Sequence, residues 1–287
     1  MPDPIAPPIA PPDAADVDDA ITRALAEDIG EGDLTTRATA PAGTRLKLEM
    51  RARKPVVVCG IDIAREVFRR TVPEASFEAL VADGTRVEAG TVLARLEGPA
   101  AGLLTGERTA LNFVQMLSGI ATLTRRFVDL TDGTKATVLD TRKTIPGLRT
   151  LSKFATRTGG ARNHRLRLDD WYLIKDNHVA VAGSVGEATR RAIAAGTGKL
   201  VQVECDTLDQ VAEAIEAGAE SLLLDNMGLD ELRQAVAFNG GRIPLEASGG
   251  VNLDTVRAIA ETGVDLISIG AITQSAPAVD IGLDLAE

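Results

Sequence analysis

The densest cluster of residues able to do chemistry lies between residues 140 and 178. This stretch holds nine Lys or Arg residues against four Asp residues, and it contains both histidines of the chain, His164 and His178. The chain as a whole carries a net charge of -10, so its positive charge is concentrated here. A solvated basic face is the simpler interpretation of a charge run, but these cations alternate with Gly, Asn and His. We therefore expect the stretch to bind an anion.

Charged residues also follow a series of short apolar runs. From residue 135 onward, runs of strand length alternate with helical segments, which predicts a parallel sheet covered by helices. Six such units favour an incomplete β/α barrel, with an open doubly wound sheet as the alternative. In a barrel the active site lies at the carboxyl ends of the strands. The charged residues at the predicted strand ends are Asp140, Lys175, Glu204, Asp225 and Glu246.

The last predicted strands end in small residues that each precede a predicted helix. Backbone N–H groups and a helix N-terminus at these positions could bind a phosphate. Glu204 and Asp225 end adjacent predicted strands and could hold Mg²⁺ through their oxygens or through water, whereas no His/Cys cluster suggests zinc. The residues thus predict a basic bowl with a phosphate pocket, suited to a phosphorylated sugar and an anionic partner. The small residues are Ser248, Gly249, Gly250, Gly270 and Ala271.

The first half of the chain has a different pattern. Six prolines within residues 1–16 predict a disordered arm, and a helix is expected to follow it. Alternating apolar residues over 46–50 predict a strand, and further helices are expected over 61–70 and 105–131. Two turn-bounded segments over 83–93 resemble the hairpin of lipoyl and biotinyl carrier domains, although the modifiable Lys at its tip is absent.

Composition narrows the class of protein. The apolar share of 45% and the charged share of 25% are ordinary for a globular protein. No apolar run approaches the roughly 20 residues that span a bilayer, no charged start indicates a signal peptide, and the acidic balance argues against nucleic-acid binding. Cys59 and Cys205 lie far apart and are interpreted as reduced thiols. We therefore expect a cytoplasmic protein without a membrane or nucleic-acid partner.

Several strings, in this order and at this spacing, resemble quinolinate phosphoribosyltransferases over nearly the whole chain after the proline arm. The most specific are TRKTIPGLR at 141–149 and IKDNH at 174–178, and NHR at 163–165, LDNM at 224–227 and SGG at 248–250 agree with them. The stretch 167–172 departs from the pattern, because the family more often has Gly at position 167 and one acidic residue rather than two.

The resemblance implies transfer of phosphoribose from phosphoribosyl pyrophosphate to the nitrogen of quinolinate. Pyrophosphate is released and the 2-carboxylate leaves as CO₂, giving nicotinate mononucleotide for NAD synthesis. The resemblance also implies an N-terminal α/β sandwich domain over 17–118 and a barrel domain over 119–287, whose last helix could pack back on the first domain. It further implies a homodimer, with a higher oligomer left open, and Mg²⁺ as cofactor.

The matching positions take roles from the resemblance. Cations are expected to clamp the two carboxylates of quinolinate, since the fork of Arg matches a carboxylate. This group is Arg142, His164, Arg165 and Lys175, joined by Arg108 reaching across the dimer. Glu204 and Asp225 are expected near the ribose hydroxyls and Mg²⁺, and Lys143 near the leaving pyrophosphate. The small residues over 248–250 and 270–271 are expected to hold the 5-phosphate. The expected catalytic residues are Lys143, Lys175, Glu204 and Asp225.

Two other functions fit parts of the pattern. A related phosphoribosyltransferase of the same fold could act on another base, such as nicotinate, but a monocarboxylate needs fewer cations. A non-catalytic carrier or binding module could be built on the hairpin over 83–93, but it leaves the charged strand ends unexplained.

Overall fold

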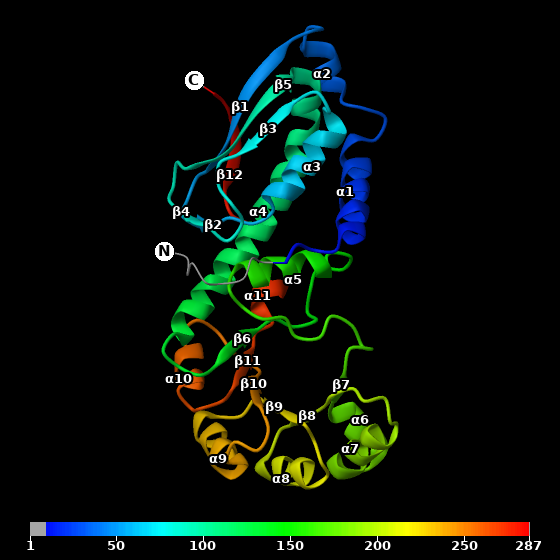
Figure 1. Cartoon of the computed structure of the whole chain (residues 1–287), viewed down its shortest axis with the longest axis vertical. Coiled ribbons are helices and arrows are strands. Elements are labelled where there is room, and N and C mark those ends of the chain that lie inside the picture. Colours follow the sequence, from blue (N-terminus) through cyan, green and yellow to red (C-terminus); the bar gives the residue numbers. More distant parts are fainter. Residues whose placement is uncertain (1–9, 287) are drawn as a thin grey trace. The chain divides into compact units, whose positions relative to one another are not determined.

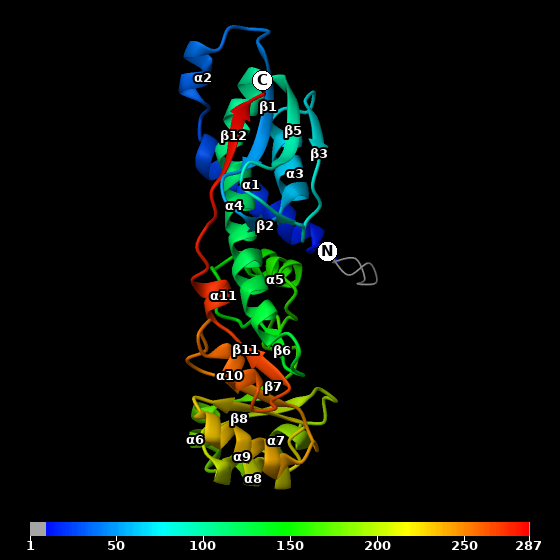
Figure 2. The ribbon, with the colours of Figure 1, turned by 90° about the vertical axis from the view of Figure 1, so that its left-hand side faces the viewer.

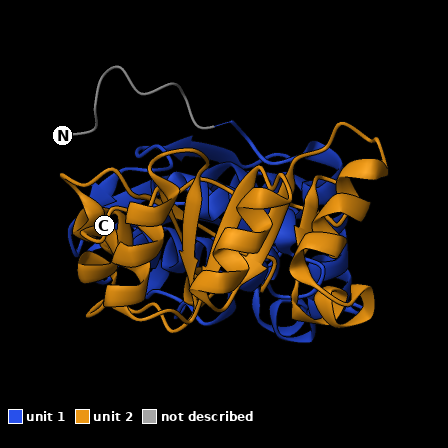
Figure 3. Cartoon of the chain, turned by 90° about the horizontal axis from the view of Figure 1, so that it is seen from below, with its two compact units in different colours: residues 1–125, 144–160, 273–287 blue, residues 126–143, 161–272 orange. Residues whose placement is uncertain are grey.

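The computed structural model describes residues 10–286, which form two compact units (Figure 3). Unit 1 combines the chain up to residue 125 with residues 144–160 and the chain from residue 273, and unit 2 comprises 126–143 and 161–272. Most of the predicted proline arm, residues 1–9, lies outside the described residues. Its predicted end at residue 16 is wrong, because helix α1 (Ala14–Ile29) already begins at Ala14, where the Asp13 carboxylate accepts from the backbone N–H groups of Ala15 and Asp16.

Unit 1 is built on a four-stranded antiparallel sheet with the order β12-β1-β5-β3 (Figure 1). The predicted alternation over 46–50 is confirmed, since Leu48 and Met50 of β1 point into the core. The strands are β1 (Arg45–Ala52), β3 (Ser76–Ala79), β5 (Val92–Pro99) and β12 (Ile281–Leu285), with a separate pair β2 (Val56–Val57) and β4 (Arg86–Val87). The other helices of this unit are α2 (Leu34–Thr39), α3 (Ile61–Thr71), α4 (Ala100–Thr131) and α5 (Arg149–Thr158). Helix α4 belongs to unit 1 as far as residue 125 and continues into unit 2.

The carrier-like hairpin over 83–93 is not formed. Strand β4 pairs with β2, whereas β5 pairs along its length with β1 and β3. The eight-residue alternation of β5 gives it a long ladder with β1, which a two-residue partner cannot offer. The predicted division at 118/119 falls inside the continuous helix α4, and the chain ends in strand β12 of the unit 1 sheet rather than in a helix.

Unit 2 is a six-stranded parallel sheet with the order β6-β11-β10-β9-β8-β7. The strands are β6 (Thr137–Leu139), β7 (Tyr172–Ile174), β8 (Val201–Cys205), β9 (Ser221–Asp225), β10 (Leu245–Ser248) and β11 (Leu266–Ser268). The helices are α6 (Asp176–Ala182), α7 (Val185–Ala194), α8 (Leu208–Glu216), α9 (Leu229–Asn239), α10 (Val256–Ala260) and α11 (Ala271–Gln274), the last ending beyond the unit.

The strand order confirms the incomplete barrel. From β7 to β11 each strand pairs with the next strand along the chain, so the sheet is built up in one direction. The first strand, β6, lies beside the last, β11. Helices α6 to α9 accordingly cover one face of the sheet (Figure 2). A doubly wound sheet would reverse direction and carry helices on both faces, so that alternative is wrong. The barrel is open between β6 and β7, where a single parallel bridge joins Leu139 to Arg162.

No helix within residues 10–286 is long and apolar enough to cross a membrane.

Candidate active site

The carboxyl ends of the barrel strands carry most of the residues predicted for the site. Asp140 and Lys175 directly follow β6 and β7, Glu204 is the second-last residue of β8, and Asp225 is the last residue of β9. Glu246 is the exception. It is the second residue of β10, which continues to Ser248 through its parallel pairing with Asp225. The prediction that Glu246 ends a strand is therefore wrong, and its side chain is only 1% exposed.

Two arginines of unit 2 form an incompletely paired cationic site. Arg165 is 6% exposed, and burial together with the positive charge of Arg142 lowers the pKa of its guanidinium. Arg165 Nη1 donates to the carbonyl of Trp171 at 3.1 Å. The Nε atoms of Arg142 and Arg165 are buried, and neither has a hydrogen-bond partner among residues 10–286. Buried donors without partners are costly, so the pair favours an anion that can accept from both.

A buried carboxylate fixes the backbone that carries Arg165. Asp140 is fully buried and accepts from Asn163 Nδ2 at 2.6 Å and from the backbone N–H of His164 at 2.8 Å. His164 Nδ1 in turn accepts from the backbone N–H of Arg165 at 2.8 Å, and its ring lies 5.0 Å from that of Trp171. The NHR string is therefore held in one conformation.

Lys175 and Glu204 lie together at the same edge. Lys175 Nζ donates to Glu204 Oε2 in a short ion pair between the ends of neighbouring strands. The backbone N–H of Lys175 donates to His178 Nδ1 at 2.9 Å, which closes the first turn of α6. The two motif residues Lys175 and His178 are thus oriented by the helix that follows them.

The predicted metal ligands meet the requirements of Mg²⁺ in part. Glu204 pairs in register with Leu223, so Asp225 lies one two-residue step further along, about 7 Å, and on the same face of the sheet. Among residues 10–286, no group of three or more His, Cys, Asp or Glu side chains could hold a metal ion. Two carboxylates nevertheless suit Mg²⁺, which commonly binds one or two carboxylates together with substrate phosphates.

The loop after β10 is tightly packed against the loop after β9. Gly249 has a φ of +91°, and a Cβ there would lie 2.1 Å from Asn226 Oδ1. The Asn226 backbone N–H donates to the Ser248 carbonyl at 2.9 Å. The prediction that a helix follows each of the two small-residue segments is confirmed: α10 begins at Val256 after a short loop, and α11 begins directly after Gly270.

The atypical stretch 167–172 is organised by one of its two acidic residues. Asp170 Oδ2 accepts from the backbone N–H groups of Leu166 and Arg167 at 2.5 and 3.1 Å. Asp169 instead pairs with Arg167 on the surface. Asp169 and Arg167 therefore form an ion pair with each other, and the Asp169 carboxylate takes no part in the hydrogen bonds by which Asp170 holds the loop.

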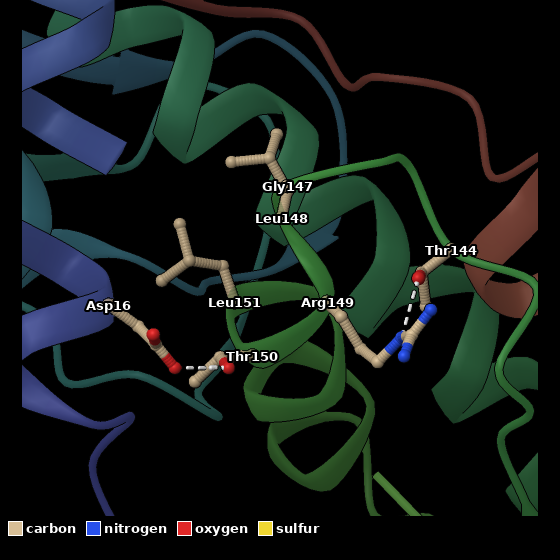
Figure 4. Close-up of a pocket in the computed structure, with 7 residues that line it drawn as sticks. All are labelled: Asp16, Thr144, Gly147, Leu148, Arg149, Thr150 and Leu151. Atoms are coloured by element: carbon tan, nitrogen blue, oxygen red, sulfur yellow. Dashed lines mark hydrogen bonds between the residues drawn. The ribbon is translucent and has the colours of Figure 1, made fainter. Parts of the chain in front are cut away.

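The TRKTIPGLR string divides between the units. Arg142 and Lys143 belong to unit 2, and Lys143 is exposed. Thr144 and residues 147–149 border a cavity of about 290 Å³ in unit 1 (Figure 4). There Arg149 Nε donates to Thr144 Oγ1 at 3.2 Å, and Thr150 Oγ1 donates to Asp16 at 2.5 Å. The predicted Arg108 also belongs to unit 1 and is exposed on α4.

Models of known families match the two halves of the chain. The N-terminal domain of quinolinate phosphoribosyl transferase matches residues 33–118, and its C-terminal domain matches residues 120–284. The chain belongs to the quinolinate phosphoribosyl transferase family.

Individual relatives agree with this assignment. The chain is 46% identical over 273 residues to the nicotinate-nucleotide pyrophosphorylase [carboxylating] of Mycobacterium leprae, covering 93% of this chain and 96% of that protein. It is 42% identical to the probable enzyme of the same name from Bacillus subtilis, covering 90% of each. The solved nicotinate-nucleotide pyrophosphorylase of Francisella tularensis superposes with a TM-score of 0.93 at 38% identity, covering 98% of this chain and 100% of that chain.

Two residues near the site were not predicted. The backbone carbonyl of Trp171 accepts from Arg165, and Gln202 lies two residues before Glu204 on β8. The alternation of a strand could have placed Gln202 on the same face as Glu204. Nothing in the sequence marked Trp171, because its contact with Arg165 is made through the backbone.

Proposed function

We propose that this family member transfers phosphoribose from phosphoribosyl pyrophosphate to quinolinate and releases the 2-carboxylate as CO₂. The products are nicotinate mononucleotide and pyrophosphate, and the reaction supplies NAD synthesis. The observation that carries this assignment is the pair Arg142 and Arg165, whose buried Nε donors have no hydrogen-bond partner among residues 10–286. A planar dicarboxylate accepts from both and offsets their mutual repulsion.

Quinolinate is bound by cations of the barrel edge. Arg142 and Arg165 donate to its carboxylates, and Lys175, which directly follows β7, adds a third positive charge. The two ring nitrogens of His164 face the Arg165 backbone and Glu246. His164 therefore contributes by holding Arg165 in place.

The ribose and its phosphates occupy the adjoining strand ends. Glu204 and Asp225 bind the ribose hydroxyls and hold Mg²⁺, directly or through water, while Lys143 attracts the leaving pyrophosphate. When bound, Mg²⁺ neutralises phosphate charge and so favours departure of the leaving group. Ser248, Gly249, Gly250, Gly270 and Ala271 surround the 5-phosphate, where the positive φ of Gly249 shapes the loop.

The chain catalyses the reaction by orientation and charge placement. The ring nitrogen of quinolinate displaces pyrophosphate at C1 of the ribose, and no protein nucleophile is needed. The bond from C2 to the carboxylate then breaks, the positive charge of the new pyridinium nitrogen stabilises the electron pair left on C2, and that pair takes up a proton. The cations of the clamp hold the dianion in the required orientation.

We further propose that the enzyme is a cytoplasmic homodimer in which Arg108 reaches quinolinate in the partner subunit's site. Arg108 and Leu104, four residues apart, share an exposed stripe of α4, and Leu34 on α2 is 79% exposed. Thr105 Oγ1 donates to Asp33 at 3.2 Å, so the two helices lie together. Burial of these leucines in a two-fold interface would remove apolar surface from water and would bring Arg108 to the partner subunit.

The test is a direct assay with purified protein, Mg²⁺ and phosphoribosyl pyrophosphate, comparing quinolinate with nicotinate. We expect nicotinate mononucleotide and CO₂ from quinolinate, and little product from nicotinate, because a monocarboxylate leaves part of the clamp unpaired. Turnover of nicotinate at the same or a higher rate would assign the enzyme to the other base.

A further inference from the structure

Two polar side chains lie in the barrel interior one step below the proposed site. Glu246 precedes Ser248 by two residues on β10, and Gln202 precedes Glu204 by two residues on β8. Side chains two apart on a strand share a face, so both point to the same side as the site residues above them. Glu246 and Gln202 are almost completely buried and border a cavity of about 620 Å³ at the amino ends of the strands.

Glu246 belongs to a closed circuit of four side chains, His164, Trp171, Gln202 and Glu246. Trp171 Nε1 donates to Gln202 Oε1 at 3.2 Å, and Gln202 Nε2 donates to Glu246 Oε2 at 2.7 Å. Because an indole N–H can only donate, it fixes which end of the Gln202 amide faces Glu246. Glu246 Oε2 lies 3.6 Å from His164 Nε2, and the rings of His164 and Trp171 are 5.0 Å apart.

Two members of this circuit, His164 and Trp171, contact Arg165. His164 Nδ1 accepts from the Arg165 backbone N–H, and the Trp171 carbonyl accepts from its guanidinium. Arg165 Nε has no hydrogen-bond partner among residues 10–286. The direction of its unpaired donor is therefore set by two residues that Glu246 holds together.

Burying a carboxyl at the depth of Glu246 costs free energy because the group loses its contact with water. Burial raises the pKa of Glu246, while Ser268, Gln202 and the Lys175 ammonium oppose that rise and Glu204 adds to it. His164 also faces Glu246, and Arg162 and Arg242 border the same cavity. An apolar residue would fill the interior at a lower cost, so the carboxyl at position 246 is explained by the groups that it orients.

We propose that Glu246 is a positioning residue for quinolinate binding, acting on Arg165 through His164 and through Gln202 and Trp171. The inference rests on the proposed role of Arg165 in binding quinolinate. Glu246 does not touch the substrate, and its effect is confined to the quinolinate side of the site.

The experiment compares Glu246→Gln with wild type and with Ser221→Ala as matched control. Ser221 is a buried polar residue of the neighbouring strand β9 that borders the same cavity but lies outside the circuit. Quinolinate affinity is followed by the emission of Trp171, the single tryptophan of the chain, and KM is measured for both substrates. The affinity is measured over roughly pH 5 to 8, since burial raises the pKa of the Glu246 carboxyl.

We expect Glu246→Gln to weaken quinolinate binding about tenfold, in Kd and in KM, while the KM for phosphoribosyl pyrophosphate stays unchanged. The pH dependence of quinolinate affinity should also change, since the variant removes a carboxyl whose pKa is raised by burial. Ser221→Ala should match wild type in every respect. Quinolinate affinity and pH dependence equal to wild type in Glu246→Gln, or equal losses for both substrates, would overturn the proposal.

Trp171→Phe provides a second test if Glu246→Gln does not fold. It keeps an aromatic ring and the backbone carbonyl but removes the donor to Gln202, so quinolinate KM should rise alone, and an unchanged KM counts against the circuit. Wild-type protein that binds quinolinate but makes no product would refute the proposed function without affecting this inference.

Discussion

Lys175 and Glu204 form an ion pair between the ends of neighbouring barrel strands, β7 and β8. The pair places a cation of the proposed quinolinate clamp directly against an acid of the proposed ribose site. This ion pair therefore couples the two proposed substrate sites. A substitution on one side should affect the binding of one substrate alone only if it leaves the pair intact.

Arg165→Ala leaves the pair intact and tests the quinolinate side. We expect at least about tenfold weaker quinolinate binding, because a hydrogen bond to a charged group contributes roughly 1.5–3 kcal/mol. Binding of phosphoribosyl pyrophosphate should be retained. Calorimetry with each substrate measures both affinities.

The matched control is Arg167→Ala, two residues along the same loop, whose guanidinium pairs with Asp169 on the surface. That variant should bind quinolinate as wild type does. Equal affinities for Arg165→Ala and wild type would remove Arg165 from the clamp.

Glu204→Gln and Asp225→Asn test the ribose and magnesium side. Each removes an acid that ends a barrel strand in an otherwise cationic edge, so turnover should fall at least about tenfold and the Mg²⁺ concentration needed for half-maximal rate should rise. Asp206→Asn, at an exposed acid directly after β8, serves as control. Wild-type turnover and Mg²⁺ dependence in both site variants would contradict the assignment.

Gly249→Ala and Gly250→Ala form a pair that separates close packing from backbone strain. Both glycines have positive φ, but a Cβ at 249 meets Asn226 Oδ1 at 2.1 Å, whereas none of the surroundings lies within 4 Å of a Cβ at 250. Gly250→Ala should cost only the backbone strain, roughly 1–3 kcal/mol of unfolding free energy. Gly249→Ala should cost more and should also raise the KM for phosphoribosyl pyrophosphate.

Denaturant unfolding and steady-state kinetics measure these effects together. Equal destabilisation and equal KM values in the two variants would show that the contact between the β9 and β10 loops does not shape the phosphate site.

Mixed dimers test the proposed reach of Arg108. Arg108→Ala and Lys175→Ala homodimers should each be nearly inactive. Co-refolded, they should form mixed dimers with one intact site and up to about half the wild-type activity per mixed dimer, because one of two symmetric sites is complete. If mixed dimers are isolated by differential tagging and show no activity, Arg108 does not act across the interface.

Sequence periodicity predicted the barrel well because its strands are continuous apolar runs that end in polar residues. It failed at Glu246, where the charged residue that stops the apolar run lies inside the strand. A buried carboxyl paired with Gln202 interrupts the pattern as a strand end would, and only the register with Asp225 distinguishes the two.

The division into units was less accessible to sequence reasoning because it depends on contacts distant in sequence. Strand β12 joins β1 across more than two hundred residues, and α4 continues through the predicted boundary. The residues of the proposed clamp were identified through motifs, whereas the side chains that support them were not. Trp171 and Gln202 act on Arg165 and Glu246 through a backbone carbonyl and an amide that no local pattern marks.

The most direct test of the proposed reaction is the fate of the two carboxylates of quinolinate. Quinolinate labelled with ¹⁴C in either the 2-carboxylate or the 3-carboxylate is incubated with the protein, phosphoribosyl pyrophosphate and Mg²⁺. We expect the 2-carboxylate label to appear in CO₂, in equal amount to nicotinate mononucleotide, and the 3-carboxylate label to stay in the nucleotide. Nucleotide formation without labelled CO₂, or release of the 3-carboxylate label, would contradict the proposed reaction.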